Sequence, residues 1–115
     1  MAAALKTIEI LRTTPAFEQM TAAGERFRAG ITKQVEQLQH VTATYTGPVT
    51  MPYVVFADDA AHERISRFSV ACLQHGLYLH PKHNWFLSAA HDDETIDQAL
   101  DATAHAFAEV DTATA

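Results

Sequence analysis

The sequence has few of the residues that mark disulfide-rich, membrane-spanning or nucleic-acid-binding proteins. Its one cysteine, Cys72, excludes an internal disulfide and indicates a reducing compartment, so we expect a cytoplasmic protein. No apolar run approaches the ~20 residues of a membrane-spanning helix, and Lys6 and Glu9 interrupt the N-terminus where a signal peptide would be apolar. A net charge of −6 argues against binding to nucleic acid. We therefore expect neither a membrane nor a nucleic acid as partner.

Glycine is scarce, and its four positions are isolated from one another: Gly24, Gly30, Gly47 and Gly76. No glycine-rich turn therefore opens a helix, as it would in a phosphate-binding loop. Ser88 lies near His91 and Asp92, but no G-x-S-x-G motif surrounds it. This argues against a hydrolase with a serine nucleophile.

The length of 115 residues suits one domain, which we expect to span residues 1–115. Apolar residues recur at three- and four-residue steps in four segments, which predicts helices over Ala2–Leu11, Ala16–Gln39, Ala60–His75 and from Asp92 or Asp93 onward. All six phenylalanines fall at apolar positions, so we expect them in the core: Phe17, Phe27, Phe56, Phe68, Phe86 and Phe107. On the third helix we also expect Val70 and Leu73 to be buried.

Four short apolar segments predict strands: Val41–Tyr45, Met51–Phe56, Leu77–Leu79 and Trp85–Leu87. The first two should pair in an antiparallel arrangement, because only a short turn connects them. The predicted fold is α+β, with a small antiparallel sheet of three to four strands covered on one side by helices.

The stretch Gly76–His91, GLYLHPKHNWFLSAAH, carries a recognisable pattern. A glycine is followed by hydrophobic, aromatic and hydrophobic residues and a proline, then by Ser-x-x-His and a Glu-x-Ile-Asp run. The matching positions are Gly76, Leu77, Tyr78, Leu79, Pro81, Phe86, Leu87, Ser88, His91, Glu94, Ile96 and Asp97. This pattern resembles the C-terminal small domain of the pyridoxal-phosphate-dependent class III (fold-type I) aminotransferases, in particular the glutamate-1-semialdehyde aminomutase-like group. The resemblance extends from about Leu5 to Val110.

The resemblance implies a transferase or isomerase that uses pyridoxal phosphate in its intact form. In that family the Schiff-base lysine belongs to a large domain, and none of Lys6, Lys33 and Lys82 matches it. We therefore expect no catalytic residue and no cofactor on this chain alone, and an isolated chain that is inactive. The expected partner is an aminotransferase large domain, absent from this sequence, or a second copy of the chain in a homo-oligomer.

The family's small domain closes one side of the active-site cleft. The resemblance therefore implies that His80, His83, Asn84 and Trp85 line the substrate cleft of an assembled enzyme. Many relatives hold a substrate carboxylate with an arginine in this half of the chain. No arginine follows Arg67 here, so such a clamp is not expected from this domain.

Two other interpretations remain open from the residues. In the first, the chain is a stand-alone, non-catalytic dimerisation or binding module of the same fold. In the second, His80, His83 and His91 bind a divalent metal ion with Asp92 or Asp93. Since the spacing of these histidines matches no well-known metal site, we favour histidines that form hydrogen bonds with the backbone and expect no metal.

Overall fold

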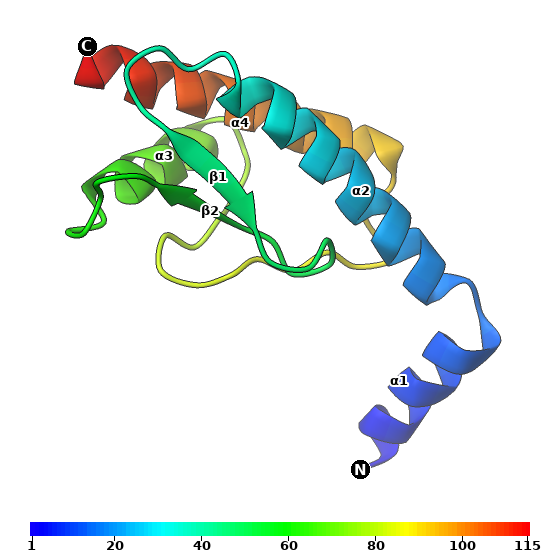
Figure 1. The fold of residues 1–115 in the computed structure, drawn as a ribbon. Helices are drawn as coiled ribbons and strands as arrows, with labels where there is room; N and C mark the ends of the chain where they lie inside the picture. Colours follow the sequence, from blue (N-terminus) through cyan, green and yellow to red (C-terminus); the bar gives the residue numbers. More distant parts are fainter.

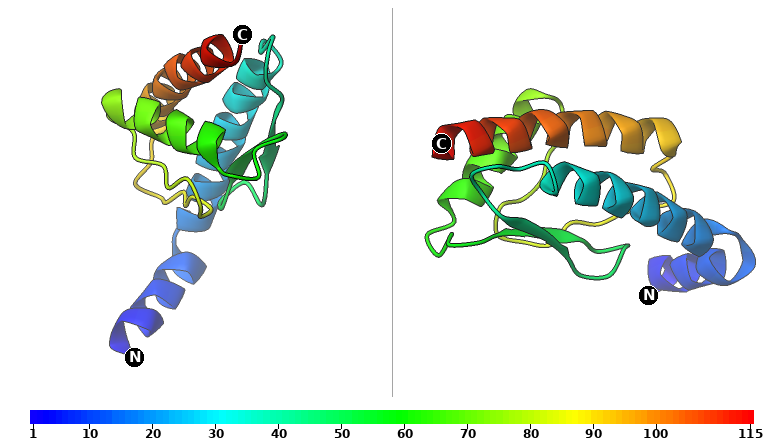
Figure 2. Two further views of the ribbon diagram at one scale, coloured as in Figure 1. Left: turned by 90° about the vertical axis from the view of Figure 1, so that its left-hand side faces the viewer. Right: turned by 45° about the horizontal axis from the view of Figure 1, so that its top comes forward.

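The computed structural model describes residues 1–115 and contains four helices and two strands. In chain order these are α1 (Ala2–Thr13), α2 (Ala16–Val35), β1 (Ala43–Thr46), β2 (Tyr53–Phe56), α3 (Glu63–Gln74) and α4 (Asp93–Thr114). Helices α2, α3 and α4 lie on one side of the β1–β2 hairpin, while α1 projects away from the rest (Figures 1 and 2). The α+β architecture with helices on one side of a small sheet is therefore confirmed. No helix combines the length and apolar character needed to cross a bilayer.

The sheet has two strands, not the three to four predicted. β1 and β2 pair antiparallel, and the segment Trp85–Leu87 lies beside the residues that precede β2. The backbone N–H of Trp85 donates to the carbonyl of Pro52 at 2.8 Å, and that of Leu87 donates to the carbonyl of Thr50 at 3.0 Å. Pairing of Trp85 with Pro52 as a strand would also require an N–H from residue 52, which proline lacks. The third strand is therefore started but not completed.

The predicted strand Leu77–Leu79 also forms no ladder. It follows Gly76, whose φ of 83° ends α3. The N–H of Gly76 donates to the carbonyl of Leu73, and the N–H of Leu77 donates to the carbonyl of Cys72. These two bonds form the cap that a glycine after a helix commonly provides. The segment then leaves the helix without a neighbouring backbone to pair with.

Two carboxylates shift the helix ends from the predicted positions. Asp111 of α4 accepts hydrogen bonds from the N–H groups of Gln39, His40 and Val41, so the chain turns there and α2 ends at Val35. Asp59 accepts from the N–H groups of Arg64 and Ile65, and α3 begins at Glu63. Asp92 accepts from the N–H of Thr95 and caps α4, which begins at Asp93 as predicted.

Phe68 lies at the centre of the core, fully buried, with its ring 4.5 Å from that of Phe107 and 5.8 Å from that of Phe56. Phe27 is also buried, but Phe17 is 54% exposed and Phe86 is 61% exposed. The prediction of six core phenylalanines is therefore wrong for these two. Val70 and Leu73 of α3 are exposed as well. Spacing along a helix defines a face, but it does not say whether a neighbouring element covers that face.

Close packing of α2 explains its two glycines. A Cβ atom at Gly24 would collide with the backbone carbonyl of Val49, and one at Gly30 would collide with the side chain of Leu100. Cys72 is fully buried on α3, and burial raises the pKa of its thiol to about 12. By contrast, α1 has no buried residue, and Leu5, Ile8 and Leu11 are exposed along it.

Candidate functional site

The loop His80–Trp85 is fixed to the hairpin and to itself by side-chain hydrogen bonds, in addition to the backbone bond from Trp85 to Pro52. The hydroxyl of Tyr53 donates to the backbone carbonyl of Pro81. The indole N–H of Trp85 donates to the carbonyl of His80 at 2.9 Å. The N–H of Lys82 donates to Nδ1 of His80 at 3.0 Å. Since these bonds close a short segment at both ends, the loop has a defined shape.

Trp85 links this loop to the core. Its ring stacks on Phe68 at 6.4 Å with an angle of 19° between the planes, and it lies 5.6 Å from the ring of Tyr53. Burial raises the pKa of the Tyr53 hydroxyl, and the negative charge of Asp59 adds to that effect. Tyr53 therefore remains protonated and can donate its hydrogen bond to the loop over the physiological pH range.

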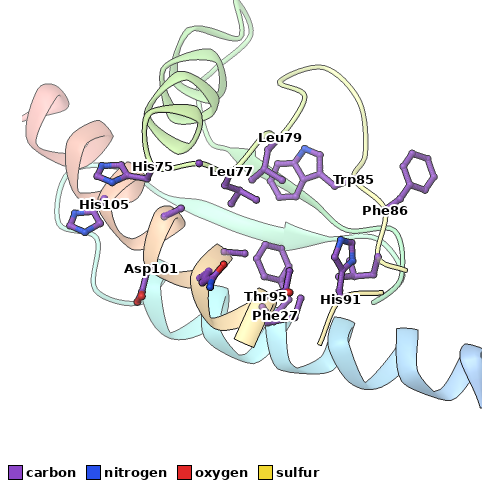
Figure 3. Close-up of a pocket in the computed structure, with 16 residues that line it drawn as sticks. Phe27, His75, Leu77, Leu79, Trp85, Phe86, His91, Thr95, Asp101 and His105 are labelled. Atoms are coloured by element: carbon purple, nitrogen blue, oxygen red, sulfur yellow. The ribbon is translucent and has the colours of Figure 1, made fainter. Parts of the chain in front are cut away.

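An open cleft of about 550 Å³ lies between the segments Leu77–Leu79 and Trp85–Leu87 and the first half of α4. Leu77, Leu79, Trp85 and Phe27 lie around this space in Figure 3. The polar side chains at its border are His75, His91, Thr95, Gln98, Asp101 and His105. The cleft thus combines an apolar interior with a border rich in imidazoles, and no lysine or arginine lines it.

Four residues were expected to line the substrate cleft of an assembled enzyme. Only one of them lines the cleft within this chain. Trp85 forms part of its wall, and it is 6% exposed. His80 and His83 are exposed on the loop outside the cleft, and Asn84 is half-buried there. His83 lies 5.7 Å from the ring of Phe86, and its Nδ1 is 2.7 Å from the carbonyl of Asn84. The exposed face of the loop therefore presents His80 and His83 together, with their rings 6.2 Å apart, and neither residue lines the cleft.

The sequence did not indicate the histidine pair at the border of the cleft. His75, at the end of α3, and His105 of α4 stack with ring centroids 4.4 Å apart and planes 8° from parallel. Asp101 precedes His105 by one turn of α4 and also lines the cleft. The two histidines are thirty positions apart and share no periodic pattern, so only the packing of α3 on α4 brings them together.

The residues of this chain do not fit a pyridoxal phosphate site. That cofactor requires a lysine for a Schiff base and donors for its phosphate. Lys6 is exposed and paired with Glu9 on α1, Lys33 is exposed on α2, and Lys82 is exposed in the loop. All three lysines are therefore exposed, and none lines the cleft described above.

The histidines do not assemble into a metal site either. No three His, Cys, Asp or Glu side chains are placed to hold one ion. Instead, Nδ1 of His80 accepts from the N–H of Lys82, and Nδ1 of His91 accepts from the N–H of Ser88 at 3.0 Å. This is the backbone hydrogen bonding favoured from the sequence.

Comparison with known proteins relates the chain to aminotransferases. It is 43% identical over 110 residues to an aminopentol aminotransferase of Sphingopyxis macrogoltabida and 31% identical over 111 residues to a 3-aminobutyryl-CoA aminotransferase of Cloacimonas acidaminovorans. Among solved structures, it matches the pyridoxal phosphate internal aldimine form of the FumI protein of Sphingopyxis sp. MTA144, with 42% identity and a TM-score of 0.86. No family model matches the chain.

Each match covers nearly all of this chain but only about a quarter of the relative. The matches include 96%, 94% and 96% of this chain, but only 26%, 27% and 26% of the respective relatives. The chain is therefore similar, over nearly its whole length, to about a quarter of a pyridoxal-phosphate-dependent aminotransferase. A class III small domain fits this match.

Proposed function

We propose that the chain is the C-terminal small domain of a class III pyridoxal-phosphate-dependent aminotransferase of the glutamate-1-semialdehyde aminomutase-like group, and that it acts with a large domain in the cytoplasm. The observation that carries this proposal is the 43% identity over 96% of the chain to one part of an aminotransferase. A TM-score of 0.86 to a solved enzyme supports the same assignment at the level of the fold.

On this proposal, the chain is not catalytic by itself. Its three lysines are exposed, and the cleft has no lysine or arginine in its lining. The large domain would supply the Schiff-base lysine and the phosphate-binding groups. The small domain would contribute shape and substrate contacts.

The part of the chain that would contact substrate is the loop His80–Trp85. Trp85 anchors the loop to the core, and the exposed imidazoles of His80 and His83 project from it. Neutral or protonated imidazoles can donate hydrogen bonds to substrate oxygens. The half-buried Asn84 would add a side-chain amide at the edge of the same surface.

A chimeric enzyme tests the assignment. The 110 matched residues of the aminopentol aminotransferase are replaced by the matching residues of this chain. We expect the chimera to bind pyridoxal phosphate, seen as cofactor absorbance, and to transaminate the relative's own substrate. The isolated 115-residue chain should show neither property. A stable chimera that binds no cofactor would contradict the assignment.

Two substitutions in the chimera separate the roles of the loop residues. Lys82→Ala should leave cofactor binding and turnover unchanged, because Lys82 is a solvated loop lysine. His83→Ala should raise KM by several-fold and change kcat little, because it would remove a substrate contact outside the chemical step. His40→Ala, at an exposed histidine outside the loop, is the matched control and should change neither constant.

A stand-alone dimerisation module is the second candidate, and the exposed apolar face of α1 favours it. Leu5, Ile8 and Leu11 lie on one side of a helix that has no buried residue. Sedimentation equilibrium of the isolated chain tests this. Self-association that Leu5→Glu and Ile8→Glu abolish would support the module, and a monomer at 0.1 mM would contradict it.

A further inference from the structure

The segment Leu77–His80 at the edge of the cleft has the side-chain pattern of a strand. Leu77 is half-buried, Tyr78 is 70% exposed, Leu79 is 7% exposed and His80 is exposed. This alternation has the period of two that a β-strand shows when one face is covered. The segment therefore has the alternating exposure of a strand, although it belongs to no sheet.

The backbone of the same segment has no partner. The N–H groups of Tyr78, Leu79 and His80 donate no hydrogen bond, and the carbonyls of Leu77, Tyr78 and Leu79 accept none. At its two ends the bonds are made: the N–H of Leu77 caps α3, and the carbonyl of His80 accepts from Trp85. An unpaired strand edge is the feature to which another extended chain adds.

The cleft beside this edge matches the side chains of an added strand. Its interior is apolar, with Leu79, Trp85 and Ile96 buried and Ala99 on the wall of α4. An extended peptide would direct every second side chain into this space and the alternate ones to solvent. Leu77–His80 spans about 13 Å at ~3.3 Å per residue, which suits four or five residues of the added strand.

We propose that the cleft is the docking site of an extended polypeptide segment with alternating apolar side chains, which pairs with the backbone of Leu77–His80. The segment comes from the part of the same aminotransferase that lies outside the quarter matched here, so this proposal rests on the proposed function. The relatives have about three quarters of their length beyond the match. Without this segment, Leu77–Leu79, which the sequence predicted as a strand, remains unpaired.

Hydrogen exchange in the chimeric enzyme tests the proposal. Ala99 lies in the cleft wall, whereas Ala108 is exposed on the same helix outside it, so Ala99→Phe fills the cleft and Ala108→Phe is the matched control. Successive N–H groups of an extended segment point to opposite edges, so an added strand pairs either with Tyr78 and His80 or with Leu79. We expect the amides on the paired edge to exchange at least tenfold more slowly in the chimera than in the isolated chain. Ala99→Phe should remove that protection and Ala108→Phe should keep it.

The outcomes distinguish this proposal from the assignment of function. A chimera that transaminates, but in which the three amides exchange as fast as in the isolated chain, would overturn the docking site and leave the function intact. Protection in the isolated chain that grows with its concentration would also overturn it, because the occupant would be a second copy. Protected amides in a chimera without cofactor would support the docking site while the assignment of function failed.

A second measurement applies if the chimera does not fold. Overlapping 12-residue peptides that cover the rest of the aminopentol aminotransferase are added to the isolated chain, and the fluorescence of Trp85, the single tryptophan, is recorded. We expect one contiguous group of peptides to change the emission, and Ala99→Phe to abolish the change. No response to any peptide, or an equal response with Ala99→Phe, would contradict the proposal.

Discussion

The backbone N–H of Trp85 donates to the carbonyl of Pro52 at 2.8 Å, and no hydrogen bond returns from residue 52. This one-sided bond holds the segment Trp85–Leu87 beside the hairpin without making it a strand. The proline thereby removes one donor that a third strand would need, and the N–H of Thr50 likewise returns no bond to Leu87.

Replacing the proline should extend the pairing. Pro52→Val adds an N–H opposite the carbonyl of Trp85, so we expect a new hydrogen bond between these two residues. The amide of residue 52 should then exchange at least tenfold more slowly than the amide of an exposed loop residue such as His83. Free exchange of the new amide would contradict this account of the sheet.

The hydrogen bond from Trp85 to His80 should stabilise the loop by a measurable amount. Trp85→Phe keeps an aromatic ring against Phe68 but removes the indole donor. We expect the free energy of unfolding to fall by about 1–2 kcal/mol, from the lost hydrogen bond and the smaller ring. Tyr53→Phe removes only the hydroxyl that donates to Pro81, and its smaller effect, read from urea unfolding, serves as the comparison.

Two phenylalanines should differ sharply in their effect on stability. Phe68 is fully buried among Phe56, Phe107 and Trp85, so Phe68→Ala should lower the free energy of unfolding by about 3–5 kcal/mol. Phe17 is 54% exposed, and Phe17→Ala should change it by less than about 1 kcal/mol. Urea denaturation at one pH measures both, and equal effects would place Phe17 in the core.

Asp111 should make the fold sensitive to acid. Hydrogen bonds from the N–H groups of Gln39, His40 and Val41 lower the pKa of its carboxyl, although desolvation opposes them. A carboxyl with a lowered folded pKa stabilises the fold above its unfolded pKa, and this contribution is lost as the pH falls through the folded pKa. The urea concentration at the midpoint of unfolding should therefore fall when the pH is lowered below about 4.

A pair of variants isolates this contribution. Asp111→Asn removes the charge that titrates, so the variant should be less stable at pH 7 and its midpoint should depend less on pH below about pH 4. Asp101, exposed and without a hydrogen bond, provides the control Asp101→Asn. An unchanged pH profile in Asp111→Asn would show that this carboxylate does not link the turn after α2 to α4.

The helices and the hairpin were predictable because their signals are local. Apolar residues at three- and four-residue steps identified all four helices, and the short turn around Gly47 identified the pairing of β1 with β2. The failure of the other two predicted strands to form could not be seen from local signals. Their alternating pattern was present, but pairing requires a partner backbone that supplies donors, and Pro52 lies 33 positions before Trp85.

The candidate site was predictable only in part. The sequence singled out the stretch Gly76–His91, and the structure places its Trp85 in the cleft wall and fixes the loop that contains His80 and His83. It did not indicate His75 and His105 as a pair, because they meet only through the packing of α3 on α4. Residues far apart in sequence with no shared period leave no local signal.

Because Cys72 is buried, the folded chain should react only slowly with thiol reagents. A maleimide or an iodoacetamide dye would react with the native protein only during openings that expose the core, so its slow reaction would time those openings. A cysteine introduced at an exposed position such as His83 would be labelled far sooner than the natural one. Spectroscopic probes can thus be attached one at a time, without first removing the cysteine that the protein already has.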